Sequence, residues 1–212
     1  MRFTVEDTVA ATGGVLRQAG TARWFRGVST DTRQLRPGEL FVALKGPNFA
    51  GEKFLRTAAR RGAAGVVCRR PPARGTLPRS VAVIQVPDTL RALGDLAQWW
   101  RSRFTLPVVG ITGSNGKTTT KEMTALVLSA KYRTLKTEGN LNNLIGVPQT
   151  LFRLNRRHQV AVIEMGMNAP GEIDRLAAIA APQIGVVTNV GRAHLQGLKN
   201  VRRVAAAKGA EK

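Results

Sequence analysis

Apolar and polar residues follow two different patterns along this chain, and the change between them falls near residue 105. In the second half, short apolar runs alternate with longer amphipathic stretches. They predict strands at 106–112, 132–136, 159–164 and 184–188, and helices at 117–130, 147–154, 171–181 and 200–208. Such alternation is typical of a parallel sheet whose faces are covered by helices.

The first half is less regular, with shorter runs separated by Gly and Pro. Thr4 can cap a first helix, and "GVSTDTRQLRPGELFVALKG" (27–46) predicts two strands around a Pro-Gly turn. A helix at 51–62, the strands "AAGVVC" and "VAVIQV", and a helix capped by Asp88 follow. That last helix carries two adjacent tryptophans, for which packing in a core or between domains is the favoured role.

We therefore expect an α/β protein with a small mixed α/β domain at 1–104 and a parallel-sheet domain at 105–212. The chain stops at "AAAKGAEK", in or just after a helix, and no closing strand follows. An open parallel sheet that ends in this way is incomplete. We therefore expect this sequence to be the N-terminal part of a longer protein.

Composition adds a strong positive charge to this picture. The chain has 33 Lys and Arg against 13 Asp and Glu, a formal net charge of +20. Such a balance suits anionic partners, including nucleic acid, membrane surfaces and phosphorylated substrates. Nucleic-acid binding is disfavoured because the arginines are scattered in pairs and few aromatic residues are available to stack bases. A generally basic surface is the alternative.

Other features indicate a cytoplasmic protein. No run of about 18 apolar residues predicts a membrane span, and the N-terminus "MRFTVEDTVA" has no signal-peptide pattern. The single cysteine, Cys68, lies in an apolar run, which favours a buried structural thiol.

The stretch "VVGITGSNGKTTTKEM" (108–123) predicts a buried strand, a small-residue loop and a helix. Free amides at a helix N-terminus attract phosphate, Lys117 could neutralise β- and γ-phosphates, and the Thr118 hydroxyl could coordinate Mg²⁺. The usual pattern G-x-x-x-x-G-K-[ST] does not fit, because Ile111 stands where its first glycine belongs. An ordinary Gly-rich turn is the alternative, but the order of strand, glycines, GKT and helix favours a P-loop-type nucleotide site.

More polar residues fall near strand ends, where parallel sheets bind ligands. Glu164 ends an apolar strand and is costly to bury without a partner such as a metal ion, unless it is simply exposed. His194 follows the strand at 184–188, and Lys208 lies on a small-residue helix. Taken alone, a structural histidine and a solvated lysine are the favoured interpretations. The asparagine-rich segment "EGNLNNLIGVP" (138–148) fits either a loop or a ligand site.

These motifs, taken together and in this order, resemble the Mur ligases. The matching segments are "VSTDTRQLRPGELFVALKG", "TGSNGKTTTKEM", "GNLNNLIGVPQTLF", "VIEMGMNAPGEIDRL" and "AAAKG". They are most similar to the MurF group, which adds D-alanyl-D-alanine to UDP-N-acetylmuramoyl-tripeptide in peptidoglycan synthesis. This family uses the shorter pattern G-x-x-G-K-[ST], which residues 113–118 fit.

The resemblance implies an ATP-dependent amide-bond ligase that works through an acyl phosphate, with ATP and Mg²⁺ bound by the second domain. The implied nucleotide-binding residues are Gly113, Ser114, Asn115, Gly116, Lys117, Thr118, Thr119, Asn140 and Asn143. The implied metal ligands are Thr118, Glu164, His194 and a carbamylated Lys208, and the implied catalytic residues are Lys117, Glu164, His194 and Lys208. The first domain is expected to bind the UDP-substrate through Ser29, Asp31, Arg33 and Lys45.

The sequence also departs from the family. Members are roughly twice as long and carry a C-terminal domain that closes over the site, and "GPNFAGEKF" differs from their usual substrate-domain pattern. We therefore expect this chain, a monomer, to bind nucleotide weakly without turnover. The alternatives are another Mur-type ligase, MurE-like or folylpolyglutamate synthase-like, and a basic anion-binding module without catalysis.

Overall fold

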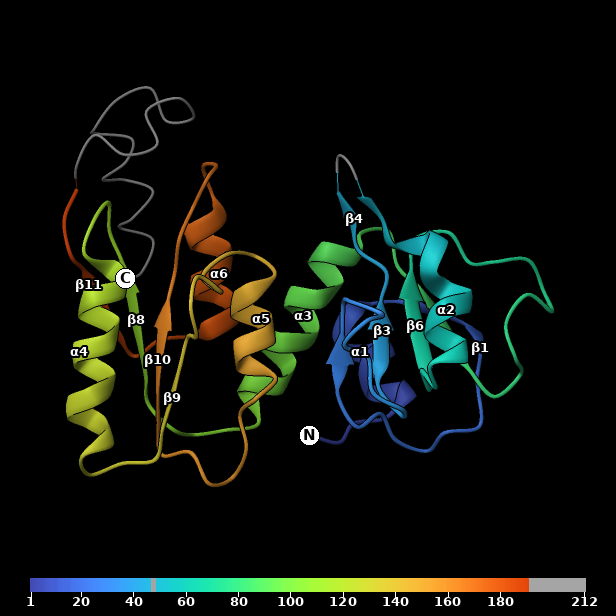
Figure 1. Cartoon of the computed structure of the whole chain (residues 1–212), viewed down its shortest axis with the longest axis horizontal. Helices are drawn as coiled ribbons and strands as arrows, with labels where there is room; N and C mark the ends of the chain where they lie inside the picture. The colour runs from blue at the N-terminus through green and yellow to red at the C-terminus, as the bar shows by residue number, and fades with distance from the viewer. Residues whose placement is uncertain (47–48, 191–212) are drawn as a thin grey trace. The chain divides into compact units, whose positions relative to one another are not determined.

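The computed structural model describes residues 1–46 and 49–190, and the chain divides into two compact units, Met1–Leu96 and Ala97–Lys212 (Figure 1). The division falls inside helix α3 (Thr89–Ser102), whereas the sequence places the boundary just after it. The assignment of domains to 1–104 and 105–212 stays a prediction. Within the described ranges, no helix is long and apolar enough to cross a membrane.

The first unit contains a five-stranded sheet in the order β1-β7-β6-β3-β2. Its strands are β1 (Val15–Gln18), β2 (Val28–Ser29), β3 (Leu40–Val42), β6 (Gly65–Cys68) and β7 (Ala82–Gln85). All neighbouring strands are parallel except β1, which runs antiparallel to β7. The sequence did not predict β1, because this outer strand is largely exposed and shows no apolar alternation.

Helices and a short hairpin complete the first unit. They are α1 (Val5–Thr12), the 3₁₀ turn η1 (Gly51–Phe54), α2 (Leu55–Arg60), the start of α3, and the pair β4 (Lys45–Gly46) and β5 (Phe49–Ala50). The predicted caps are confirmed: Thr4 and Asp7 form a reciprocal capping box on α1, and the Asp88 carboxylate accepts from the amides of Leu90 and Arg91. The helix predicted at 51–62 is a 3₁₀ turn followed by a shorter α-helix.

Cys68 lies in the core of the first unit, as the apolar run around it predicts. Its side chain is fully buried among residues that include Phe41, Val66 and Val83. Burial, with a smaller contribution from the Glu52 carboxylate, raises the pKa of the thiol to about 12. Cys68 is therefore a packing residue and not a nucleophile at neutral pH.

The second unit contains a parallel sheet in the order β11-β8-β10-β9. Its elements are β8 (Val108–Thr112), α4 (Lys117–Ser129), β9 (Thr134–Lys136), α5 (Gly146–Leu151), β10 (Val160–Glu164), α6 (Glu172–Ala180) and β11 (Ile184–Val187). Helix α4 lies on one face of the sheet, and α5 and α6 lie on the other (Figure 1). The predicted strands and helices up to residue 188 are confirmed, and the helix predicted at 200–208 falls outside the described residues.

The topology places one loop in a special position. From β8 the chain passes through α4 and β9 to β10 on one side, and then through α6 to β11 on the other. The carboxyl end of β8 therefore lies between two strands at the point where the strand order reverses. Ligands of open α/β sheets bind at such switch points. The loop at 113–116 begins there.

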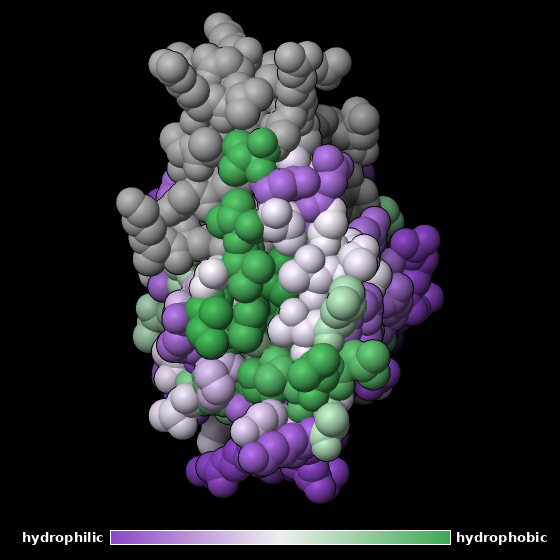
Figure 2. All heavy atoms as spheres, turned by 90° about the vertical axis from the view of Figure 1, so that its left-hand side faces the viewer, coloured by the Kyte–Doolittle hydropathy of each residue, from purple (hydrophilic) through white to green (hydrophobic). Residues whose placement is uncertain are grey.

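Helix α4 has an unusual distribution of side chains. Its apolar residues Met123, Leu126 and Val127 are exposed, and the apolar surface that they form with neighbouring residues is visible in Figure 2. Toward the sheet, the helix buries Lys121 and Ala125. A helix that covers a sheet normally buries its apolar residues, so the buried lysine requires a specific reason.

Arg101 links the end of α3 to other segments of the second unit by hydrogen bonds. The side chain is buried, and its guanidinium donates to the carbonyl oxygens of Phe104 (2.6 Å), Ala180 (3.0 Å) and Leu106 (3.2 Å). Burial lowers the pKa of this guanidinium. Its neighbour Trp100 is also buried and donates to the Leu154 carbonyl, which confirms a packing role for this tryptophan.

We expect Arg101→Met to reduce the free energy of unfolding by about 3 kcal/mol, because it leaves several buried carbonyl groups without a donor. Arg103→Met is the matched control. Arg103 is exposed and stacks over the Trp99 ring at 4.8 Å, so its loss should cost about 1 kcal/mol or less. Urea denaturation measures both values, and equal effects of the two substitutions would contradict the assigned role.

Candidate nucleotide and metal site

The loop between β8 and α4 contains two glycines with positive φ angles. Gly113 has φ 147° and Gly116, which precedes the first turn of α4, has φ 79°. Both values favour glycine. A Cβ atom at Gly113 would overlap the hydroxyl of Thr188, at the end of β11. Gly113 therefore allows the start of the loop to pass close to Thr188.

The donors of this loop are held by groups of the protein itself. The Asn189 carboxamide oxygen accepts from the amides of Ser114 (3.1 Å) and Asn115 (2.9 Å). The Lys117 ammonium donates to the carbonyls of Gly113 (2.9 Å) and Ser114 (3.4 Å). A bound phosphate would face these amides and the Lys117 ammonium, with one of its oxygens in the place of the Asn189 oxygen. The loop is thus shaped for an anion.

Glu164, at the end of β10, is buried, which excludes the exposed strand-end carboxylate that the sequence left open. Its Oε1 accepts from the Asn142 carboxamide (2.8 Å) and the Thr118 hydroxyl (3.2 Å). Its backbone amide donates to the Thr137 hydroxyl (3.0 Å). The carboxylate is therefore tied both to the first turn of α4 and to the segment that follows β9.

The second oxygen of this carboxylate has no hydrogen bond. Glu164 Oε2 is buried and lacks a donor in the part of the chain that the structure describes. A buried, unpaired carboxylate oxygen is costly unless a cation is nearby. The nearest described cation is Lys121, whose Nζ lies 3.9 Å away. Oε2 is thus a free acceptor beside the phosphate loop.

Lys121 lies between two carboxylates. Its side chain is fully buried, and its Nζ lies 2.8 Å from Glu122 Oε1, although it makes no hydrogen bond of good geometry among the described residues. Glu122 is exposed and also pairs with Lys136. The ammonium groups of Lys121 and then Lys136 lower the pKa of the Glu122 carboxyl to about 2. The sequence interpretation missed Lys121, although its spacing of four from Lys117 and Ala125 places it on the sheet-facing side of α4.

The asparagine-rich segment contributes Asn142, which the sequence interpretation did not single out, whereas nucleotide binding by Asn140 and Asn143 stays a prediction. Asn142 reaches Glu164, whereas the Asn143 side chain accepts from the amides of Ile145 and Gly146 at the start of α5. Asn140 is exposed. Asn143 therefore binds the backbone just before and at the start of α5, and no described contact brings Asn140 or Asn143 to Glu164. Nothing in the local sequence separates these three amides, because the register of the loop decides which one points inward.

Two further predicted site residues, His194 and Lys208, lie outside the described residues. Within residues 1–46 and 49–190, no three His, Cys, Asp or Glu side chains gather as a metal centre. The other histidine, His158, is half-buried, and its Nδ1 accepts from the Asn155 amide. Burial and the nearby Arg153 lower its pKa.

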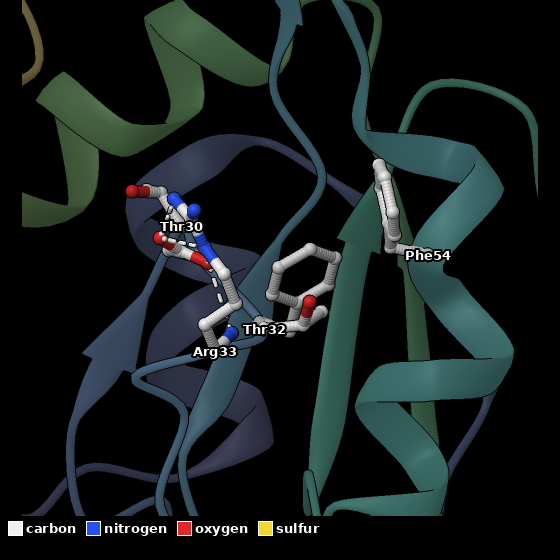
Figure 3. A pocket seen from close by; sticks show the side chains of 6 residues that line it. Thr30, Thr32, Arg33 and Phe54 are labelled. Atoms are coloured by element: carbon white, nitrogen blue, oxygen red, sulfur yellow. Dashed lines mark hydrogen bonds and ion pairs between the residues drawn. The ribbon is translucent and has the colours of Figure 1, made fainter.

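The first unit has a pocket of about 400 Å³ at the loop after β2. It is lined by Thr30, Asp31, Thr32, Arg33, Phe41 and Phe54. Figure 3 shows Phe54 opposite the segment that carries Thr30 and Arg33. This volume is within the range of about 300–1,000 Å³ that small-molecule sites occupy.

Two of the predicted substrate residues line this pocket. The Asp31 carboxylate pairs with the exposed Arg33 guanidinium (2.7 Å), whose hydrogen bonds lower the pKa of the Asp31 carboxyl. The Ser29 hydroxyl donates to the Asp31 carbonyl and shapes the loop. Lys45 lies on the separate β4–β5 hairpin and does not line the pocket.

Comparison with known proteins gives a consistent result. The family profile "Mur ligase family, catalytic domain" matches residues 25–101, and the profile "Mur ligase middle domain" matches residues 111–210. A UDP-N-acetylmuramoyl-tripeptide–D-alanyl-D-alanine ligase of Synechocystis is 49% identical over 181 residues, which are 85% of this chain and 39% of that protein.

Solved structures show the same relationship. MurF from Acinetobacter baumannii has a TM-score of 0.92 at 36% identity, covering 100% of this chain and 46% of that one. MurF from Thermotoga maritima, solved in complex with ADP, has a TM-score of 0.80 at 33% identity over 88% of this chain and 42% of that one. The chain thus spans less than half the length of these relatives. Motifs, fold and similarity agree that the chain belongs to the Mur ligase family.

Proposed function

We propose that this chain forms the substrate-binding and ATP-binding parts of a ligase that joins D-alanyl-D-alanine to UDP-N-acetylmuramoyl-tripeptide in peptidoglycan synthesis. One observation carries the ATP-binding part. The Thr118 hydroxyl, in the first turn after the phosphate loop, donates to the buried carboxylate of Glu164. Loop and carboxylate therefore form a single site. The names of the relatives support the two substrates.

The nucleotide phosphates would bind the amides of residues 113–119. In the structure the Asn189 oxygen accepts from two of these amides, so a phosphate oxygen would replace it. Lys117 donates to a loop carbonyl and would donate to a phosphate oxygen instead. These partners keep the loop satisfied and ordered before nucleotide arrives, which reduces the ordering cost of binding. Asn140 and Asn143 stay proposals for the remainder of the nucleotide.

The residues present fit Mg²⁺. Glu164 Oε2 is a buried oxygen with no hydrogen bond from any described residue, and the Thr118 hydroxyl lies beside the same carboxylate. Mg²⁺ is commonly held by one or two carboxylates together with substrate phosphates. When bound, it would withdraw charge from the phosphate oxygens. His194 and a carbamylated Lys208 stay predictions for further ligands.

The proposed reaction has two steps. The terminal carboxylate of the tripeptide attacks the γ-phosphorus of ATP, the bond to the β–γ bridging oxygen breaks, and ADP leaves. The amine of D-alanyl-D-alanine then attacks the acyl carbon of the acyl phosphate, loses a proton and displaces inorganic phosphate. The positive charge of Lys117 and the loop amides allows the two anionic reactants to approach each other.

We assign binding of the UDP-linked substrate to the pocket of the first unit. Arg33 there is exposed and can exchange its partner Asp31 for a phosphate group, and Phe54 offers an apolar wall. Ser29 supports the loop, and Lys45 stays a proposal with no contact to this pocket. A monomeric state and a cytoplasmic location likewise stay predictions.

Lys117→Ala should weaken ADP and ATP binding about tenfold or more, because charge-assisted hydrogen bonds each contribute about 1.5–3 kcal/mol. Isothermal titration calorimetry with the 212-residue chain measures this change. The control is Lys131→Ala, an exposed lysine just beyond the far end of α4 that stacks near Tyr132. Nucleotide affinity that is equally reduced in both variants would mean that general charge binds the nucleotide.

For the pocket, we expect Arg33→Met to weaken UDP binding at least about fivefold through the lost contact with phosphate. Arg36→Met serves as the control, because Arg36 is exposed three residues further along and does not line the pocket. Changes in the fluorescence of a labelled UDP report both affinities. Unaltered binding in Arg33→Met would place the UDP group elsewhere.

The choice of amine decides between the proposed ligase and the other Mur-type ligases. In the protein translated from its complete reading frame, ATP-dependent phosphate release with the UDP-linked acceptor should require D-alanyl-D-alanine. A diamino acid or glutamate should give less than about a hundredth of that rate, since a polar site rejects amines that leave its groups unpaired. Release with a diamino acid or glutamate would favour a MurE-like or folylpolyglutamate synthase-like enzyme. Salt-sensitive nucleic-acid binding that survives Lys117→Ala would favour the anion-binding module.

A further inference from the structure

Lys121 occupies a position that packing does not explain. It faces the sheet from α4 together with Ala125, which packs on Val109, Ile111 and Val162. An apolar side chain at this position would extend that cluster. Replacing a buried ion pair by well-packed apolar residues is often neutral or stabilising. The Lys121 ammonium therefore matters through its charge, which acts on the neighbouring carboxylate of Glu164.

The position of the ammonium suits a second partner as well as Glu164. Lys121 Nζ lies 3.9 Å from Glu164 Oε2 and 2.8 Å from Glu122 Oε1. Among the described residues, no donor bonds the first oxygen, which is buried, whereas the second belongs to an exposed carboxylate that also pairs with Lys136. The ammonium is therefore nearer to the exposed carboxylate than to the buried one.

We propose that Lys121 is a positioning residue that acts as an internal counter-ion of Glu164 and competes with Mg²⁺ for Oε2, and that its closer contact with Glu122 keeps the ammonium from covering this oxygen. This inference rests on the proposed function, in which Glu164 binds the metal. Without metal, the ammonium lies near enough to Glu164 to offset the charge of its carboxylate. With metal, Glu122 would hold the ammonium away from Oε2, so that two cations do not share one oxygen.

The two neighbours of the metal site should then affect metal affinity in opposite directions. Removing the Lys121 charge removes the competitor, so affinity rises. Removing the Glu122 charge takes away the partner that holds the ammonium back from Oε2, so affinity falls. A lysine that only supports the fold would produce no such pair of opposite effects. A general electrostatic influence of Glu122 would persist when Lys121 is absent, whereas an effect exerted through Lys121 would not.

The experiment uses Mn²⁺ alone as the probe, with the electron paramagnetic resonance signal of the free ion as the readout. We expect Lys121→Met, which keeps the length of the side chain, to bind Mn²⁺ about tenfold more tightly than wild type. Glu122→Gln should bind it about two- to threefold more weakly. In the double variant, the effect of Glu122→Gln should shrink to that of the control Glu138→Gln, another exposed carboxylate in an ion pair, with Arg153.

Each outcome decides a separate point. Equal Mn²⁺ affinity in wild type and Lys121→Met would overturn the inference while leaving the proposed metal site intact, provided that Glu164→Gln abolishes binding. Binding that survives Glu164→Gln would overturn both the metal site and the inference. If Lys121→Met does not fold, the exposed Glu122→Gln variant decides alone, and an affinity no lower than that of Glu138→Gln would overturn the inference.

Discussion

The burial of the Glu164 carboxylate is the constraint on which the second unit depends. A charge at the end of a fully buried strand is tolerated only if donors and a cation surround it. Thr118, Asn142 and Lys121 supply them from the first turn of α4, the loop after β9 and the middle of α4. One carboxylate thus fixes the helix, the asparagine loop and the strand end relative to one another.

The same arrangement explains why α4 exposes apolar residues and buries a lysine. Its orientation is set at its N-terminus, where the loop must present its amides and Thr118 must reach Glu164. Once that end is fixed, the helical repeat turns Lys121 and Ala125 toward the sheet. The contact of the first turn with Glu164 is therefore consistent with a buried lysine further along the helix, where hydrophobicity alone would favour an apolar residue.

The phosphate loop and the pocket of the first unit share one physical feature. In both, a cationic side chain is held by an acceptor of the protein: Lys117 by loop carbonyls and Arg33 by the Asp31 carboxylate. Such partners keep the cation in place, and under the proposed function they would be exchanged for phosphate oxygens. The large positive charge of the chain adds a long-range attraction for anionic ligands.

The sequence by itself determined the order of strands and helices, the parallel sheet, the caps at Thr4 and Asp88, and the phosphate loop, because local periodicity and turn chemistry encode them. The sequence also identified Glu164 as a candidate site residue, because an acidic residue rarely ends an apolar strand without a partner. Only the tertiary structure decided that Asn142 rather than Asn140 or Asn143 reaches Glu164, and that Lys121 lies beside it. Those choices depend on loop register and on which side of α4 meets the sheet, and both are set by contacts between segments distant in the chain.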